Sequence, residues 1–268
     1  MTDVRVGVVF RPQSPPEELR EAVVAADQAG IDELWVWEDC FFEGGLTTAA
    51  AALAWSERIT VGIGLLPVPL RNPALAAMEI ATLARTFPNR FSPALGHGVL
   101  DWMGQVGARV ESPMTLLREY TDAVRRLLQG ETLTVSGRYV HLDDVGLAWP
   151  PPVAPPVVIG ARGPKTVALA GEVGDGVLLD AWLVTRDGGV DTEYLATESA
   201  RVREAAAAAG RPAPRVITFA EIEPETPALG DRARELVAAI AAAGADTVVL
   251  QCTSEHPNPG PLIAALAG

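Results

Sequence analysis

The sequence predicts a single (β/α)8 barrel, and three observations support that prediction. Eight short apolar runs recur along the 268 residues, and almost every run is followed by a segment with helical spacing of apolar side chains. Strands that alternate with helices pair in parallel. Eight such units in about 250 residues are typical of a TIM barrel. An open doubly wound sheet is the main alternative, but it usually has fewer strands, and residues 11–16 contain no GxGxxG turn after the first strand.

The predicted strands are bounded by turn residues and are mainly apolar, as expected for a buried parallel sheet. They cover residues 4–10, 33–37, 59–66, 91–96, 157–159, 176–179, 216–221 and 247–250. Residues 133–135 and 139–142 flank a Ser-Gly-Arg turn, which predicts a small hairpin inserted between the fourth helix and the fifth strand. We therefore expect one barrel domain over residues 1–268.

The predicted helices show apolar residues at helical spacing and several recognisable ends. They cover residues 17–29, 47–55, 73–86, 114–129, 192–209, 229–243 and 261–266, with a further helix after Pro164. Asn72 and Pro73 form an N-cap with proline at the first helical position, and Gly30 ends the first helix. Residues 98–112 are predicted to be a loop.

Composition excludes several classes of partner. The chain has 21 Lys and Arg against 34 Asp and Glu, a net charge of −13, which argues against nucleic acid or an anionic membrane. Neither a signal-peptide pattern nor an uncharged apolar run of membrane-spanning length is found, so we expect no membrane association. Two cysteines form no disulfide framework, which favours a reduced, cytoplasmic setting. The three histidines are far apart and the cysteines lack zinc spacing, so no metal site is expected.

The most informative stretch joins the fifth strand to the next helix, over Gly160, Ala161, Arg162, Gly163, Pro164 and Lys165. The two glycines allow close approach of a ligand or a positive φ, and the proline suits the first helical position. The N–H groups of Lys165 and Thr166, the helix dipole and two cationic side chains would then face an anion. The segment is therefore a candidate phosphate site. An ordinary βα turn that uses Gly and Pro for geometry is the alternative.

Polar or reactive residues follow most of the predicted strands. In a barrel these positions form the active face, although polar loops also occur there for other reasons. The residues are Arg11, Glu38, Asp39, Cys40, Arg71, His97, Asp101, Asp180, Trp182, Glu221, Gln251 and Cys252.

Several segments resemble the luciferase-like monooxygenase superfamily, and within it the deazaflavin-dependent oxidoreductases close to methylene-tetrahydromethanopterin reductase. The match spans nearly the whole chain in order, and the motifs are specific together although each is weak alone. The resembling segments are residues 30–39 (GIDELWVWED), 59–65 (ITVGIGL), 71–74 (RNPA), 82–83, 89–91, 95–98, 130–139, 159–165 (IGARGPK), 169–172, 175–176 and 242–246.

The resemblance implies a TIM barrel with a redox cofactor at its mouth. The Gly-Pro form of the loop favours coenzyme F-420 (F420) over flavin mononucleotide (FMN). The family carries a cis peptide in a bulge of strand three that supports the cofactor ring, which here would lie at Gly64–Leu65. It also implies a small-molecule substrate and a homodimer. The cofactor-binding candidates are thus Gly64 and Leu65 with residues 160–165.

Two positions depart from the family pattern. Its Asp-His pair at the end of strand two is Asp39-Cys40 here, and Val99 stands where sugar-phosphate dehydrogenases of the family have a carboxylate. Glucose-6-phosphate chemistry is therefore not expected. His97 and Asp39 are the candidate proton donors, and Cys40 is a third candidate, with a small buried hydrophobe as its alternative role.

Three other functions remain open from the sequence. One is an FMN-dependent monooxygenase on the same fold. The second is a non-catalytic, cofactor-binding relative, which the missing histidine would permit. The third is an unrelated phosphosugar-binding barrel.

Overall fold

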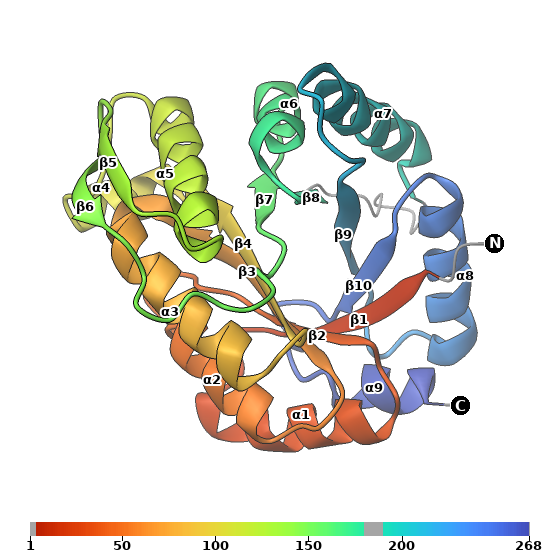
Figure 1. The fold of residues 1–268 in the computed structure, drawn as a ribbon. Coiled ribbons are helices and arrows are strands. Elements are labelled where there is room, and N and C mark those ends of the chain that lie inside the picture. Colours follow the sequence, from red (N-terminus) through yellow and green to blue (C-terminus); the bar gives the residue numbers. More distant parts are fainter. Residues whose placement is uncertain (1–3, 180–189, 268) are drawn as a thin grey trace.

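Eight parallel strands close into a barrel, in the order β1-β10-β9-β8-β7-β4-β3-β2. The computed structural model describes residues 4–179 and 190–267. Helices surround the barrel on the outside (Figure 1). The strands are β1 (Arg5–Phe10), β2 (Glu33–Val36), β3 (Thr60–Pro67), β4 (Phe91–Gly96), β7 (Val158–Ala161), β8 (Gly176–Leu179), β9 (Arg215–Glu221) and β10 (Thr247–Gln251). The predicted (β/α)8 barrel is confirmed.

The helices follow the strands as predicted, with one exception. They are η1 (Pro16–Glu18), α1 (Leu19–Gln28), α2 (Gly45–Ala54), η2 (Val68–Leu70), α3 (Pro73–Thr86), α4 (Leu100–Gln105), α5 (Pro113–Leu128), α6 (Pro164–Val173), α7 (Thr192–Ala208), α8 (Leu229–Ala242) and α9 (Gly260–Leu266). Asn72 caps α3, because its Oδ1 accepts a hydrogen bond from the N–H of Ala74 at 2.8 Å. Across the residues described, no helix has the length and apolar character needed to cross a membrane.

The exception is α4, which lies inside the segment predicted to be a loop. The prediction over residues 98–112 was therefore wrong in part. This helix has six residues and buries a single side chain, Met103. Six residues are fewer than two turns, so they cannot show the repeat of apolar positions that identifies a longer helix.

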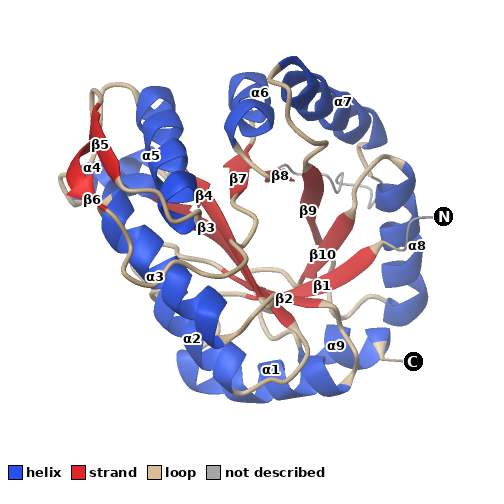
Figure 2. Ribbon diagram, viewed as in Figure 1, coloured by secondary structure: helices blue, strands red, loops and turns tan. Residues whose placement is uncertain are grey.

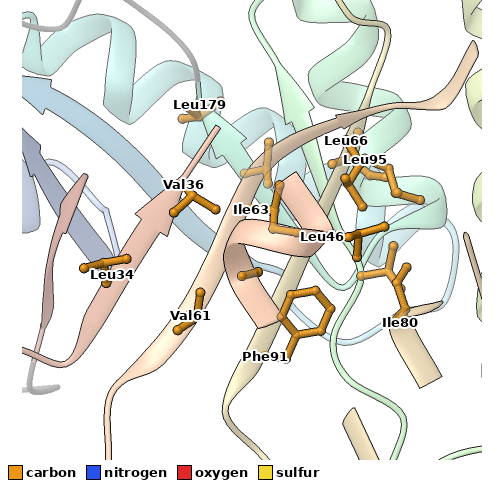
Figure 3. Close-up of a cluster of buried hydrophobic side chains, with 14 of the residues drawn as sticks. Leu34, Val36, Leu46, Val61, Ile63, Leu66, Ile80, Phe91, Leu95 and Leu179 are labelled. Carbon is orange, nitrogen blue, oxygen red and sulfur yellow. The ribbon is translucent and has the colours of Figure 1, made fainter. Parts of the chain in front are cut away.

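Apolar side chains fill the inside of the barrel and separately the space between barrel and helices. The inner cluster contains Val9, Trp35, Ala94, Val158, Leu178, Ile217, Phe219 and Val249. Outward-facing residues of β2, β3 and β4, such as Val36, Val61 and Leu95, pack instead toward Leu46 of α2 and Ile80 of α3 (Figure 3). Because side chains alternate along a strand, the two clusters fix which residues point into the barrel mouth.

A buried carboxylate closes the amino-terminal end of the barrel. Glu33 at the start of β2 is fully buried, and it forms ion pairs with Arg5 of β1, at 2.8 Å, and with Arg215 of β9. It also accepts a hydrogen bond from Nε1 of Trp35 at 2.9 Å. These contacts fill the amino-terminal end of the barrel, so the carboxyl-terminal end is the one that can hold a ligand.

The predicted hairpin is confirmed between α5 and β7. Its strands, β5 (Leu133–Ser136) and β6 (His141–Val145), pair antiparallel beside α5 (Figure 1). Glu119 of α5 holds the turn, because its carboxylate accepts hydrogen bonds from the N–H groups of Arg138, Tyr139 and Val140 at 2.8 to 3.1 Å.

Candidate active site

A cleft of about 1040 Å³ opens at the carboxyl ends of the barrel strands. Figure 2 shows the loops that leave these ends. This volume is at the upper end of the range for small-molecule and cofactor sites. The residues that line it include Arg11, Trp37, Asp39, Gly64, Leu65, His97, Gly98, Trp102, Gly160, Ala161, Arg162, Gly163, Thr166, Phe219, Glu221 and Gln251.

One half of the cleft floor is apolar because Leu65 extends over two glycines. A Cβ atom added to Gly96 of β4 would lie 2.4 Å from Cδ2 of Leu65, and one added to Gly160 of β7 would lie 2.3 Å from it. The Gly64–Leu65 peptide is cis, and the register of β3 against β4 shifts between Ile63 and Leu66. The bulge and cis peptide expected in strand three are therefore confirmed. At Gly96 and Gly160 the strands β4 and β7 therefore contribute no side chain, and Leu65 covers the floor there.

The other half of the floor is polar and lies over β1, β2, β9 and β10. Arg11 follows β1, is 7% exposed, and donates hydrogen bonds from Nη1 to Glu221 Oε2 at 2.8 Å and to the carbonyl of Cys252 at 2.7 Å. Its guanidinium group lies 4.9 Å from the ring centre of Trp37, and the Trp37 ring also stacks with Phe219. A cation, a carboxylate and an aromatic pair are thus held together at this side of the mouth.

The junction of β7 with α6 forms the edge of the apolar half. Gly163 is the N-cap of α6 and receives no side-chain cap; a Cβ added there meets no atom within 4 Å. Its φ is −96°, and Gly160 is also absent from the described residues with positive φ, so of the two roles considered for these glycines neither residue takes the positive φ. Gly160 is instead required by the side chain of Leu65. The turn itself is open to the cleft.

One of the two backbone N–H groups predicted to bind an anion already has a hydrogen-bond partner within the chain. The N–H of Thr166 donates to the carbonyl of Gly163 at 3.0 Å, so the N–H of Lys165 remains the candidate of the two. Both cationic side chains, Arg162 and Lys165, are exposed, and the carbonyl of Arg162 accepts a hydrogen bond from Tyr194 at 2.9 Å. Arg162 lines the cleft, whereas Pro164 and Lys165 do not.

His97 lies between the apolar floor and α6. It directly follows β4, lines the cleft, and its Nε2 is 3.5 Å from the hydroxyl of Thr166. Burial lowers the pKa of His97 below its ordinary value of 6.5, and a backbone contact with Pro113 opposes the shift only in part. The ring is therefore neutral at pH 7.

The residues after β2 have separate surroundings. Asp39 lines the cleft, but Cys40 does not. Burial, with Glu38 and Asp39 nearby, raises the pKa of the Cys40 thiol, so it stays protonated at neutral pH. Glu38 forms a bidentate ion pair with Arg71, with Nη2 to Oε2 at 2.9 Å, so these two predicted polar residues bind each other.

The remaining predicted residues lie apart from the cleft lining. Asp101 is exposed on α4. Cys252 is fully buried, and burial raises its pKa to about 11. Asp180 and Trp182 lie outside the described residues.

The aromatic lining residues Trp37, Trp102 and Phe219 were missed from the sequence. Trp37 and Phe219 lie two residues after Trp35 and Ile217, which are in the inner cluster. The alternation of strand side chains could have identified both. Trp102 belongs to the unpredicted helix α4, and no strand pattern points to it.

Comparison with known proteins places the chain in a family. A model described as "Luciferase-like monooxygenase" matches residues 3–223. The chain belongs to the luciferase-like monooxygenase family. The 5,10-methylenetetrahydromethanopterin reductase of Methanolobus tindarius is 30% identical over 175 residues, covering 65% of this chain and 53% of that protein. The F420-dependent glucose-6-phosphate dehydrogenase of Kineococcus radiotolerans is 30% identical over 214 residues, covering 74% of this chain and 61% of that protein.

The luciferase-like fold is also seen in solved structures. An F420-dependent secondary alcohol dehydrogenase in complex with an F420-acetone adduct has a TM-score of 0.85 at 19% identity, with 99% of this chain and 98% of that chain covered. The structural match thus extends over both chains. In sequence, the chain spans 53% and 61% of the lengths of the two curated relatives.

Proposed function

We propose that the chain is an F420-dependent oxidoreductase that transfers a hydride between coenzyme F420 and a small organic substrate. The observation that supports this best is the uncapped start of α6 at Gly163, which opens into the cleft beside an apolar floor. A phosphate group suits the first feature, and a flat ring suits the second. The F420-dependent relatives support the choice of cofactor.

The chain's residues fit such a cofactor in two places. Gly160, Ala161, Arg162 and Gly163 line the cleft and would hold its phosphate-bearing tail, together with Pro164 and the backbone N–H of Lys165 at the start of α6. Gly64 and Leu65 would support the ring from below, because Leu65 forms the apolar floor. The deazaflavin carries the hydride, and the protein binds, orients and shields it from water.

His97 is the proposed proton-transfer residue. Its lowered pKa keeps it neutral at pH 7, so it can accept a proton when the substrate is oxidised and return it in the reverse direction. Asp39 is the second candidate because it lines the same cleft. Cys40 is the weakest of the three, because its raised pKa disfavours the thiolate.

The substrate is proposed to be small and different from glucose 6-phosphate. Val99 lines the cleft at the position for which the sugar-phosphate enzymes have a carboxylate. We also propose a cytoplasmic setting, consistent with two free cysteines, and a homodimer, for which Leu75 and Met78 on α3 offer exposed apolar side chains. Sedimentation velocity would decide the oligomeric state.

Replacing Gly163 tests the phosphate site. Its φ of −96° and the empty space around it admit a side chain without strain, so Gly163→Asp should fold normally. The new carboxylate would repel a phosphate and weaken F420 binding about tenfold or more, whereas Gly163→Asn, of equal size but uncharged, should lose much less. The affinities are measured by titrating F420 into purified protein.

The same titration decides between cofactors. FMN that binds more tightly than F420 would replace the proposal with an FMN-dependent enzyme. An unchanged F420 affinity in Gly163→Asp would remove the phosphate assignment.

A further inference from the structure

The polar half of the cleft floor holds hydrogen-bonding atoms that the fold does not use. Arg11, Glu221 and Gln251 all line the cleft. Arg11 donates to Glu221 and Cys252 through Nη1 and to Gln13 through Nε. Within the described residues, Nη2 of Arg11, Oε1 of Glu221 and the side-chain amide of Gln251 make no hydrogen bond.

The order and register of the barrel strands make these three residues neighbours. Glu221 and Gln251 are register partners on β9 and β10, and the backbone of Ile222 donates to the carbonyl of Gln251 at 2.8 Å. Arg11 reaches Glu221 from β1. Their unused atoms therefore converge on one corner, bordered by Trp37.

The charge of this corner selects the class of ligand. The ion pair at 2.8 Å leaves Arg11 and Glu221 with no net charge between them. An incoming carboxylate or phosphate would gain from Arg11 but face Glu221. Glu223 and Arg232 also line the cleft, and Arg232 is paired with Glu235 at 3.2 Å, so neither sign of charge dominates there. A neutral group avoids that repulsion.

The hydrogen-bond donors and acceptors of this corner narrow the class of ligand further. Arg11 Nη2 can only donate, Glu221 Oε1 can only accept, and the Gln251 amide can do either. A hydroxyl group is the smallest neutral group that can accept from Arg11 and donate to Glu221 at once, whereas a ketone can only accept. Phe219, Ile222 and Leu236 line the cleft nearby and suit an apolar carbon skeleton.

From this arrangement we infer that the corner formed by Arg11, Glu221 and Gln251 is a substrate subsite for the hydroxyl group of an uncharged alcohol. The inference rests on the proposed function only in calling this alcohol the substrate. The subsite lies on the half of the floor opposite the proposed phosphate loop. It predicts a ranking among ligands with one skeleton, which can be measured without turnover.

The test uses three probes: cyclohexanol, cyclohexanone and cyclohexanecarboxylate. Each is titrated into the full chain with ¹⁵N-labelled tryptophan, and the Nε1–H signal of Trp37 reports binding, because its ring lies against Arg11. Trp37→Phe assigns that signal, and Trp149→Phe, far more exposed, is the matched control for the substitution. The alcohol should bind about tenfold more tightly than the ketone, and the carboxylate more weakly still.

Glu221→Gln should reverse this ranking. The variant keeps the shape of the side chain but leaves Arg11 without its counter-charge, so the carboxylate becomes the best of the three ligands. Glu223→Gln, on an exposed residue that also lines the cleft, should keep the original order. Gln251→Leu should weaken the binding of the alcohol several-fold, and Gln105→Leu on α4 is the control for this substitution.

Several results would overturn the inference. They are a carboxylate that binds as well as the alcohol to the wild-type chain, a Trp37 signal that stays fixed while a probe binds, or no binding of any probe. Displacement of the alcohol by F420 would assign the corner to the cofactor instead. Because the probes are titrated without F420, failure of the subsite and failure of F420 to bind are separate results.

Discussion

His97 has a buried ring that the fold keeps uncharged. Its pKa is lowered by burial, whereas the unfolded chain would titrate near the ordinary value of 6.5. As the pH falls below 6.5, the unfolded chain therefore takes up a proton at this histidine before the folded chain does. The stability of the folded chain decreases as the pH falls from 6.5 through the folded pKa. Above pH 6.5 the ring is neutral in both states, and the folded chain keeps its full stability.

Replacing His97 with Gln should remove this pH dependence. The melting temperature of the wild-type chain should then fall more steeply between about pH 7 and pH 5 than that of His97→Gln. Differential scanning calorimetry over a pH series measures both slopes. His141→Gln, in the exposed hairpin, is the control and should follow the wild type. Parallel wild-type and His97→Gln curves would contradict the account of the lowered pKa.

Strand β3 contributes glycines where aromatic or branched side chains from other strands need space. A Cβ added to Gly62 would lie 2.3 Å from Cδ2 of Trp35, which is fully buried. Trp35 cannot move aside easily, because its Nε1 is bonded to Glu33 and its ring packs edge-on against Phe219. The glycine at this position of β3 is therefore required by the side chain that the neighbouring strand places inside the barrel.

Gly62→Ala should be strongly destabilising for this reason. We expect a loss of about 3 kcal/mol in the free energy of unfolding, the cost of overpacking a rigid core. Gly163→Ala is the matched control and should change it by less than about 0.5 kcal/mol, since its Cβ meets nothing within 4 Å. Urea denaturation followed by circular dichroism measures both. Equal effects at the two positions would show that Trp35 adjusts.

At the scale of the whole molecule, the buried Glu33 links β1, β2 and β9 at the lower end of the barrel. Arg215→Met would leave this carboxylate with Arg5, which is itself 44% exposed. We expect a loss of about 3 kcal/mol, in one cooperative transition, because an incompletely paired buried charge is costly. Arg234→Met, on an exposed pair with Asp231, should have little effect. Urea unfolding compares the variants, and equal midpoints would exclude a role for the buried pair in closing the barrel.

The barrel was predictable because its pattern repeats eight times, so an error at one strand does not change the architecture. The cis peptide at Gly64–Leu65 followed from the family resemblance. The site was harder, since its chemistry depends on which side chains meet across strands. Arg71 and Glu38 follow different strands and bind each other, and the reason for Gly160 lies in Leu65, about a hundred positions earlier in the chain. Such pairings between distant residues leave no periodic trace in one sequence.

The position of Leu65 over Gly96 and Gly160 has a practical meaning for protein engineering. Residues 65, 96 and 160 share one small volume although they come from three strands. Libraries that vary them one at a time will sample mainly clashes at the two glycines or a void at the leucine. Varying the three together, with a small residue at 65 whenever 96 or 160 is enlarged, would move side-chain volume from one strand to another and so reshape the apolar floor of the cleft.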